Sequence, residues 1–121
     1  MKLLLILISF NCFALSNDEA RDLFKNHLES IVKNDESDFK KTTSDSYYKS
    51  LKEKSQIKEM FKMNKGNKVE SDFDVKIKKA ANEKNVFFVN IKDKKAKSYD
   101  HNWYRVIKKD KILIDGTRFF D

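Results

Sequence analysis

The feature that most constrains the fold is a change in hydrophobic period at Gly66. Before Gly66, apolar residues recur at every third or fourth position, as in an amphipathic helix. After Gly66 they alternate with polar residues, as in a half-buried strand, and the segment 69–79 (VESDFDVKIKK) alternates almost without error. Grouped helices followed by grouped strands predict an α+β fold, with the helices packed on one face of an antiparallel sheet.

The clearest helix is predicted from about residue 17 to residue 33. Asn17 and Asp18 favour helix N-termini, and the polar stretch 34–37 should end the helix. One side of this helix is an apolar stripe that contains a single histidine. The stripe consists of Ala20, Leu23, Phe24, His27, Leu28, Ile31 and Val32.

Two further helical regions precede Gly66. The segment 38–54 predicts one or two short helices, separated by the polar residues 42–44. The segment 55–64 predicts another helix, with Ser55 as its N-terminal cap and Gly66 in the left-handed conformation that often ends a helix.

About four strands are predicted after Gly66, over residues 69–79, 86–92, 98–108 and 112–120. The second of them carries apolar residues on both faces, so we expect it inside the sheet. The chain contains no proline, which fits uninterrupted strands. We therefore expect an antiparallel meander that curves around the helices like a cone.

Residues 1–16 have the three parts of a secretory signal: the basic Lys2, an apolar run, and small residues at Ala14 and Ser16. We expect cleavage after Ser16, with cleavage after Ala14 as the alternative. The apolar run is shorter than the roughly 20 residues that a membrane span needs, so no span is expected after processing. Residues 17–121 are then a single α+β domain, exported to the periplasm or secreted.

The chain has one cysteine, Cys12, and either cleavage removes it. The mature domain would then have no disulfide, no thiol nucleophile and no cysteine-based metal site. Lipidation of Cys12 stays an alternative, although Phe10 and Asn11 depart from the lipobox pattern of bacterial lipoproteins.

The formal net charge of +7 favours anionic partners. The basic residues are spread along the chain and interleaved with 19 acidic residues, which is typical of a solvated surface. A nucleic acid partner is not expected, because an exported protein rarely meets RNA or DNA.

The predicted final hairpin reads WYRVIK over residues 103–108 and ILID over residues 112–115. Together with the order of the elements, this hairpin resembles those of the nuclear transport factor 2-like superfamily, a cystatin-like α+β cone. The family often has a second tryptophan in this hairpin, where this chain has Leu113. The resemblance implies that the first helix lies across the concave side of the sheet, often with a pocket between them.

Six residues are therefore candidates for a ligand-binding pocket or sheet face. His27 is the polar member of the helical stripe, and it could orient a ligand or simply bond a neighbouring hydroxyl in the core. Tyr99, His101, Trp103 and Arg105 should share one strand face, as a binding surface or as cross-strand packing. The six candidates are His27, Tyr47, Phe73, Ile77, His101 and Trp103.

No motif for a metal, a cofactor or nucleophilic catalysis is present. The two histidines show no HxxxH spacing, and no cofactor is expected. Isomerases of the resembled superfamily pair an aspartate base with a buried tyrosine, but Asp100 and Tyr47 or Tyr48 cannot be matched to those positions, so no catalytic residue is assigned.

The sequence favours an exported, non-catalytic domain that binds a small molecule, a peptide or an envelope component. It would use a helix–sheet pocket or a face of the sheet. The alternative is an inhibitor or immunity-type module that acts on a protein through its basic surface, and an isomerase- or hydratase-type enzyme is third. A homodimer formed through the sheet also stays open.

Overall fold

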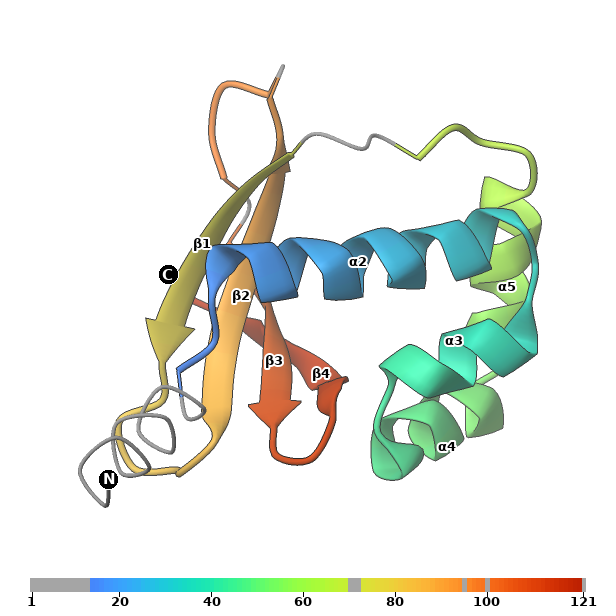
Figure 1. Ribbon diagram of the computed structural model, residues 1–121. Helices are drawn as coiled ribbons and strands as arrows, with labels where there is room; N and C mark the ends of the chain where they lie inside the picture. The colour runs from blue at the N-terminus through green and yellow to red at the C-terminus, as the bar shows by residue number, and fades with distance from the viewer. Residues whose placement is uncertain (1–13, 70–72, 95, 100, 121) are drawn as a thin grey trace, which may run out of the picture.

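The computed structural model describes residues 14–69, 73–94, 96–99 and 101–120. Within them, four helices come first and four strands follow, and the helices pack against the sheet (Figure 1). The predicted α+β class is confirmed. The helices are α2 (Asn17–Val32), α3 (Glu36–Thr42), α4 (Asp45–Glu53) and α5 (Gln56–Asn64). The strands are β1 (Phe73–Lys79), β2 (Val86–Asp93), β3 (Asn102–Lys108) and β4 (Ile112–Phe119).

Helix α2 begins at Asn17, one of its two predicted starting residues. Ser16 is the N-cap, and its hydroxyl accepts a hydrogen bond from the backbone N–H of Glu19 while the Glu19 carboxylate accepts one from the backbone N–H of Ser16. This reciprocal pair is a capping box, which satisfies two N–H groups that the helix leaves unpaired. Asn17 is thus the first helical residue, as the sequence predicted, and the residue before it supplies the cap.

The region 38–54 forms two short helices that are separated at Thr43 and Ser44, as the pattern suggested. Ser55 stands at the N-cap position of α5, but its side chain makes no capping hydrogen bond. The reason is its left-handed backbone, with φ of 57° and ψ of 21°. Gly66 follows α5 with φ of 78°, which confirms the predicted left-handed glycine.

The four strands form one antiparallel sheet in the order β1-β2-β3-β4. Strand β2 is inside the sheet, as its two apolar faces predicted. Strand β3 begins at Asn102, whereas the sequence pattern placed its start at residue 98. Residues 70–72 of the predicted first strand lie outside the described residues.

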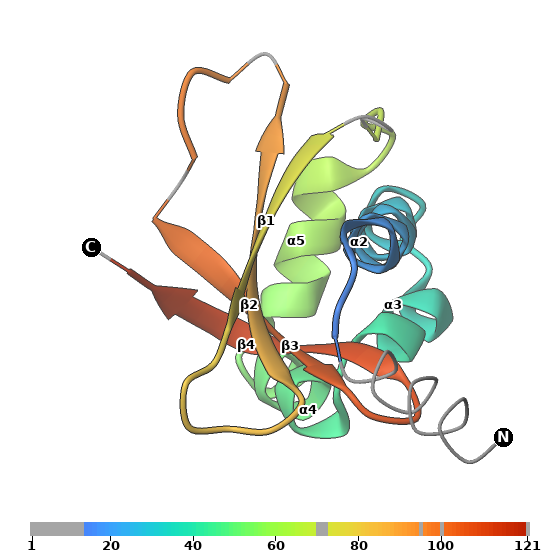
Figure 2. The same ribbon diagram turned by 60° about the vertical axis from the view of Figure 1, so that its left-hand side comes forward.

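Helix α2 crosses one face of the sheet, and α3, α4 and α5 gather around its C-terminal half (Figures 1 and 2). The core consequently has two main clusters, both of which contain residues of α2. The first lies between α2 and the inner sheet face and contains Leu15, Ala20, Leu23, Phe24, Phe73, Phe87, Val89, Val106 and Ile114. The second lies among the helices and contains Ile31, Phe39, Tyr48, Leu51, Ile57 and Phe61.

A polar junction joins the helices to strand β4. The register shifts between Arg105 and Val106, where Arg105 pairs with Gly116 and Val106 with Ile114, so Asp115 is an extra residue on β4. The Ser44 hydroxyl donates a hydrogen bond of 2.6 Å to the Asp115 carboxylate. The backbone N–H of Ser44 donates to the carbonyl of Ile114 at 2.8 Å. The N-terminus of α4 is thereby fixed to the edge of the sheet.

Candidate binding surface

His27 lies in the interior of the helical layer, with 4% of its surface exposed. Its ring centroid is 4.8 Å from that of Phe39 and 6.4 Å from that of Phe24. Its Nδ1 atom is 2.9 Å from the hydroxyl oxygen of Thr42. These neighbours surround the imidazole with two aromatic rings and one hydroxyl group.

The hydrogen bonds of Thr42 determine the tautomer of His27. The Thr42 hydroxyl donates its hydrogen to the carbonyl of Phe39 at 3.0 Å. While it does so, the same hydroxyl can only accept from His27, and this arrangement places the ring hydrogen on Nδ1. Burial lowers the pKa of His27 from 6.5 to about 4, because a charged imidazolium would lose its hydration there. The histidine is neutral at pH 7.

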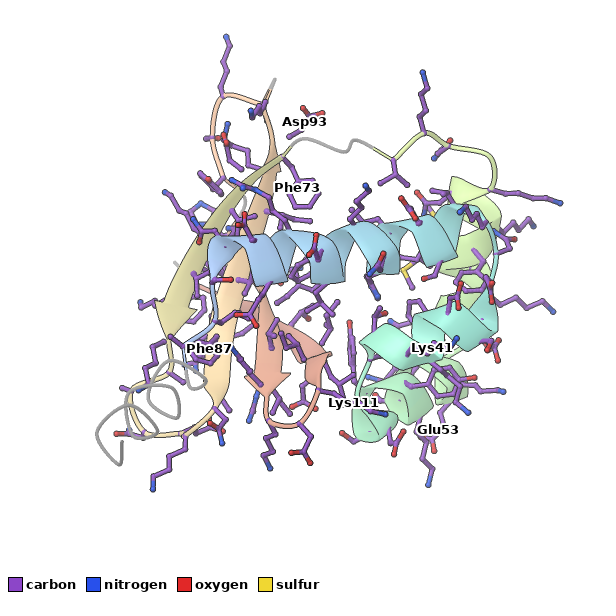
Figure 3. The ribbon with its side chains drawn as sticks, in the orientation of Figure 1. Lys41, Glu53, Phe73, Phe87, Asp93 and Lys111 are labelled. Atoms are coloured by element: carbon purple, nitrogen blue, oxygen red, sulfur yellow. The ribbon has the colours of Figure 1, made fainter. Side chains whose placement is uncertain are left out.

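Phe73 and Ile77 belong to the first core cluster, on the sheet face that α2 covers. Phe73 is 4% exposed, and Ile77 packs against the same cluster from the edge strand. The Phe73 and Phe87 side chains come from neighbouring strands on this side of the sheet (Figure 3). Tyr47, from α4, packs against both main clusters, and burial raises the pKa of its hydroxyl, with a further contribution from Tyr104.

A groove of about 410 Å³ lies beside the His27 site, between α2 and α3. Ser30 and Thr42 line it, but His27 does not. Its rim carries charges of both signs, including Glu29, Lys33 and Asp38. Four of the six candidates therefore pack in or against the core and do not line this groove. They are His27, Tyr47, Phe73 and Ile77.

The outer face of the sheet carries a separate aromatic cluster, formed by Phe88, Trp103 and Phe120. The Phe120 ring centroid lies 5.2 Å from that of Phe88 and 5.7 Å from that of Trp103, both in edge-to-face geometry. Ala80 and Val86 complete the apolar patch. The whole patch comes from strands and the segments that flank them, without a helical residue.

Cationic side chains lie over the rings of the aromatic cluster. The Arg118 guanidinium is 4.9 Å from the Phe120 centroid and 5.4 Å from that of Phe88. The Lys78 ammonium is 5.1 Å from the Phe120 centroid on the same face. Such cation–π contacts hold the cation at the surface while its aliphatic stem covers part of the ring.

A second group of cations lies over Tyr99, near the start of β3. The ammonium groups of Lys76 and Lys92 are 4.2 Å and 5.6 Å from its ring centroid. Lys92 also pairs with Asp74 at 3.4 Å. Lys76, like Lys78 and Arg118, forms no ion pair within the part of the chain that the structure describes.

Arg105 is neutralised by carboxylates at the other end of the outer face. Its guanidinium pairs with Glu83, and its Nε atom lies 3.3 Å from an oxygen of Asp115. That Nε contact lacks hydrogen-bond geometry, so it is a charge contact only. Among the described cations that lie over the aromatic rings of the outer face, those without an ion pair are therefore Lys76, Lys78 and Arg118.

His101 lies at the border of the aromatic cluster. Its backbone carbonyl accepts a hydrogen bond from the N–H of Phe120 at 2.8 Å, and its Nδ1 atom is 3.1 Å from the Phe120 carbonyl. The His101 ring itself packs against that of Phe119, with centroids 5.7 Å apart. Of the six candidates, Trp103 is the one that belongs to the aromatic cluster, on the sheet face opposite to Phe73 and Ile77. Sequence reasoning did not single out Phe88, Phe120, Lys78 or Arg118, although alternation within each predicted strand would have placed each on a face.

A basic groove of about 670 Å³ lies among the helices, and its lining residues all precede those of the aromatic cluster in the sequence. Four lysines line it, and Glu36 is the acidic residue among its walls. Glu36 pairs with Lys52 and accepts a hydrogen bond of 2.6 Å from the Tyr48 hydroxyl, which lowers the pKa of the Glu36 carboxyl. The lining residues are Asn34, Glu36, Lys52, Ser55, Ile57, Lys58, Phe61, Lys62 and Lys65.

Within the described ranges, no group of three or more histidine, cysteine, aspartate or glutamate side chains is arranged to hold a metal ion. Nor does any helix there have the length and apolar character that crossing a membrane requires.

Comparison with known proteins gave no family model, no curated protein and no solved structure that matches this chain.

Proposed function

We propose that this protein is an exported, non-catalytic binding domain that holds an acidic peptide segment against the outer face of its sheet. The observation that carries this proposal is the aromatic cluster with Lys78 and Arg118 over its rings. The cations would meet carboxylates of the peptide, and the half-buried rings of Trp103 and Phe120 would contact its aromatic or apolar side chains, with the buried Phe88 supporting them from below.

The spacing of the cations supports an extended ligand. Lys76 and Lys78 are two residues apart on β1, so their stems start on the same face about 7 Å from each other. Carboxylates at alternate positions of an extended peptide have the same spacing. A phosphate-rich envelope polymer would need only the cations, whereas the aromatic cluster offers apolar contact that such a polymer cannot use.

The resemblance to the nuclear transport factor 2-like superfamily is part of this proposal. The order of helices and strands and the path of α2 across the sheet are compatible with it. Members of that superfamily often bind beneath the first helix. In this chain the outer face is favoured, because His27 and Phe73 are buried and the half-buried Ile77 packs against the same core.

The proposal is tested with three synthetic peptides of equal length, which alternate Glu with Tyr, Glu with Ser, and Lys with Tyr. Trp103 is the single tryptophan of the chain, so its fluorescence reports directly on the aromatic cluster. We expect the Glu/Tyr peptide to bind most tightly and the Lys/Tyr peptide not to bind. Equal binding of the Glu/Ser peptide would contradict a role for the rings, and tighter binding of polyphosphate would favour the envelope polymer instead.

A pair of matched double variants locates the site. Lys78→Gln with Arg118→Gln should weaken binding of the Glu/Tyr peptide about tenfold, which is about 1.4 kcal/mol. Lys58→Gln with Lys62→Gln removes the same charge from the basic groove and should leave the affinity within about a factor of two. The reverse result would favour the alternative, a protein-directed module that acts through the helical groove.

A further inference from the structure

Leu15 is a core residue, although it precedes the first helix. It is 7% exposed and belongs to the cluster that joins α2 to the sheet, together with Phe24, Val89 and Val106. An apolar side chain at this position closes the N-terminal end of that cluster. A mature chain that lacked Leu15 would open this end of the core to water.

Ser16 is equally part of the folded domain, because it supplies the N-cap of α2. Its hydroxyl accepts the backbone N–H of Glu19 at 3.1 Å, and its own N–H donates to the Glu19 carboxylate at 3.0 Å. Without Ser16, both bonds of the capping box would be lost.

A lysine of the sheet binds the capping box from outside. The Lys108 ammonium is 2.9 Å from the Glu19 carboxylate and 2.7 Å from the carbonyl of Ala14. These contacts hold the first turn of α2 against β3. The contact with Glu19 depends on the geometry that Ser16 gives to the Glu19 side chain.

The predicted leader offers two cleavage sites that sequence alone does not separate. Cleavage after Ala14 would place the small residues Cys12 and Ala14 at the two positions that signal peptidases read. Cleavage after Ser16 would place Ala14 and Ser16 there. Residues whose side chains the folded domain uses must stay in the mature chain. Ala14 contributes only its carbonyl oxygen, and the contact of Lys108 with Glu19 remains when Ala14 is removed. From the burial of Leu15 and the capping box of Ser16, we infer that the leader is cleaved after Ala14 and that the mature protein begins at Leu15.

This inference rests on the proposed export, and its test separates the two. The full chain is expressed in a bacterium with an active general secretory pathway, and the N-terminus of the product is determined by intact mass and sequencing. We expect Leu15 as the first residue. A product that begins at Asn17, or at an acylated Cys12, overturns the inference and leaves export intact. A chain that keeps residue 1 and stays inside the cell overturns both, whereas failure of peptide binding by the exported product affects neither.

A matched variant makes the test sharper. Ser16→Asn keeps a residue that caps helices well, but asparagine is larger than the residues accepted next to the cleaved bond. We expect Ser16→Asn to be processed at the wild-type yield, with Leu15 again as the first residue. Loss of processing in Ser16→Asn would show that cleavage follows residue 16.

The folded state gives an independent measurement. A chain that starts at Asn17 should unfold at a temperature roughly 10 °C below that of a chain that starts at Leu15, because it lacks both the Leu15 side chain and the capping box. Leu15→Ser in the longer chain should reproduce part of this difference, since the cap remains. Equal midpoints for the two chains would overturn the structural argument.

Discussion

At the scale of single residues, His27 links the stability of the fold to pH. The imidazole is enclosed by Phe24, Phe39 and Thr42, and burial lowers its pKa to about 4. In the unfolded chain a histidine has a pKa near 6.5. Below pH 6.5 the unfolded chain therefore binds a proton that the folded protein excludes until the pH approaches 4.

The sign of the pH effect follows from this difference. The stability associated with neutral His27 is fully present above pH 6.5 and is lost as the pH falls toward 4. Between pH 7 and pH 5, we expect the free energy of unfolding to fall by about 2 kcal/mol from this residue alone. Urea unfolding at a series of pH values measures the slope.

Two variants assign the slope to His27. His27→Gln replaces the ring by a group that cannot titrate, so its stability should change much less between pH 7 and pH 5. His101→Gln, at the exposed histidine, is the matched control for the loss of one imidazole. A wild-type slope in His27→Gln would contradict the assignment.

At the scale of elements, the junction between α4 and α5 carries a conformational cost. Ser55 joins the two helices in the left-handed region, with φ of 57°, and its hydroxyl makes no capping hydrogen bond. For residues other than glycine this conformation costs about 1–2 kcal/mol, while glycine adopts it freely. The fold therefore imposes on Ser55 a backbone conformation that serine does not prefer.

We expect Ser55→Gly to raise the free energy of unfolding by about 0.5 kcal/mol, because relief of the left-handed strain exceeds the extra entropy of glycine in the unfolded chain. Ser50→Gly is the matched control, since Ser50 lies inside α4, and it should lower stability by about 0.5 kcal/mol. Urea unfolding of both variants shows whether each substitution raises or lowers the free energy of unfolding. Destabilisation by both substitutions would show that the serine at the junction is not strained.

At the scale of the whole molecule, α2 joins the two main core clusters. Phe24 belongs to the cluster on the sheet and Ile31 to the cluster among the helices, and Tyr47 packs against both. The cluster among the helices is consequently coupled to the sheet through α2 and Tyr47. We expect the domain to unfold in a single cooperative transition.

The prediction is tested with two probes. Far-UV circular dichroism follows mainly the helices, and Trp103 fluorescence follows the outer sheet face; their urea transitions should coincide. Ile57→Val, in α5, should lower the free energy of unfolding by about 0.5–1.5 kcal/mol. The urea midpoints seen by the two probes should therefore fall by the same amount. Met63, which is 78% exposed, provides the control, because Met63→Leu should change neither midpoint. Separate transitions for the two probes would mean that the helical end unfolds by itself.

The sequence by itself determined the order and type of the elements. The change of period at Gly66 reflects which side chains can be buried in a helix or in a strand, and this is a local property of the chain. The capping box is also predictable from the sequence, since Ser16 and Glu19 have the required spacing. It was missed because Ser16 was assigned to the cleaved leader, residues 1–16.

Only the tertiary structure decided what those elements bring together. The pairing of β2 with β3 and of β3 with β4 places Phe88, Trp103 and Phe120 in contact, and the packing of α3 on α2 gives His27 its Thr42 partner. Strand register and helix packing depend on contacts between residues far apart in the chain, and alternation within one strand cannot supply them. For the same reason, the stripe of Phe73 and Ile77 could be predicted as buried, but only the packing of α2 against it showed that its neighbours are core residues.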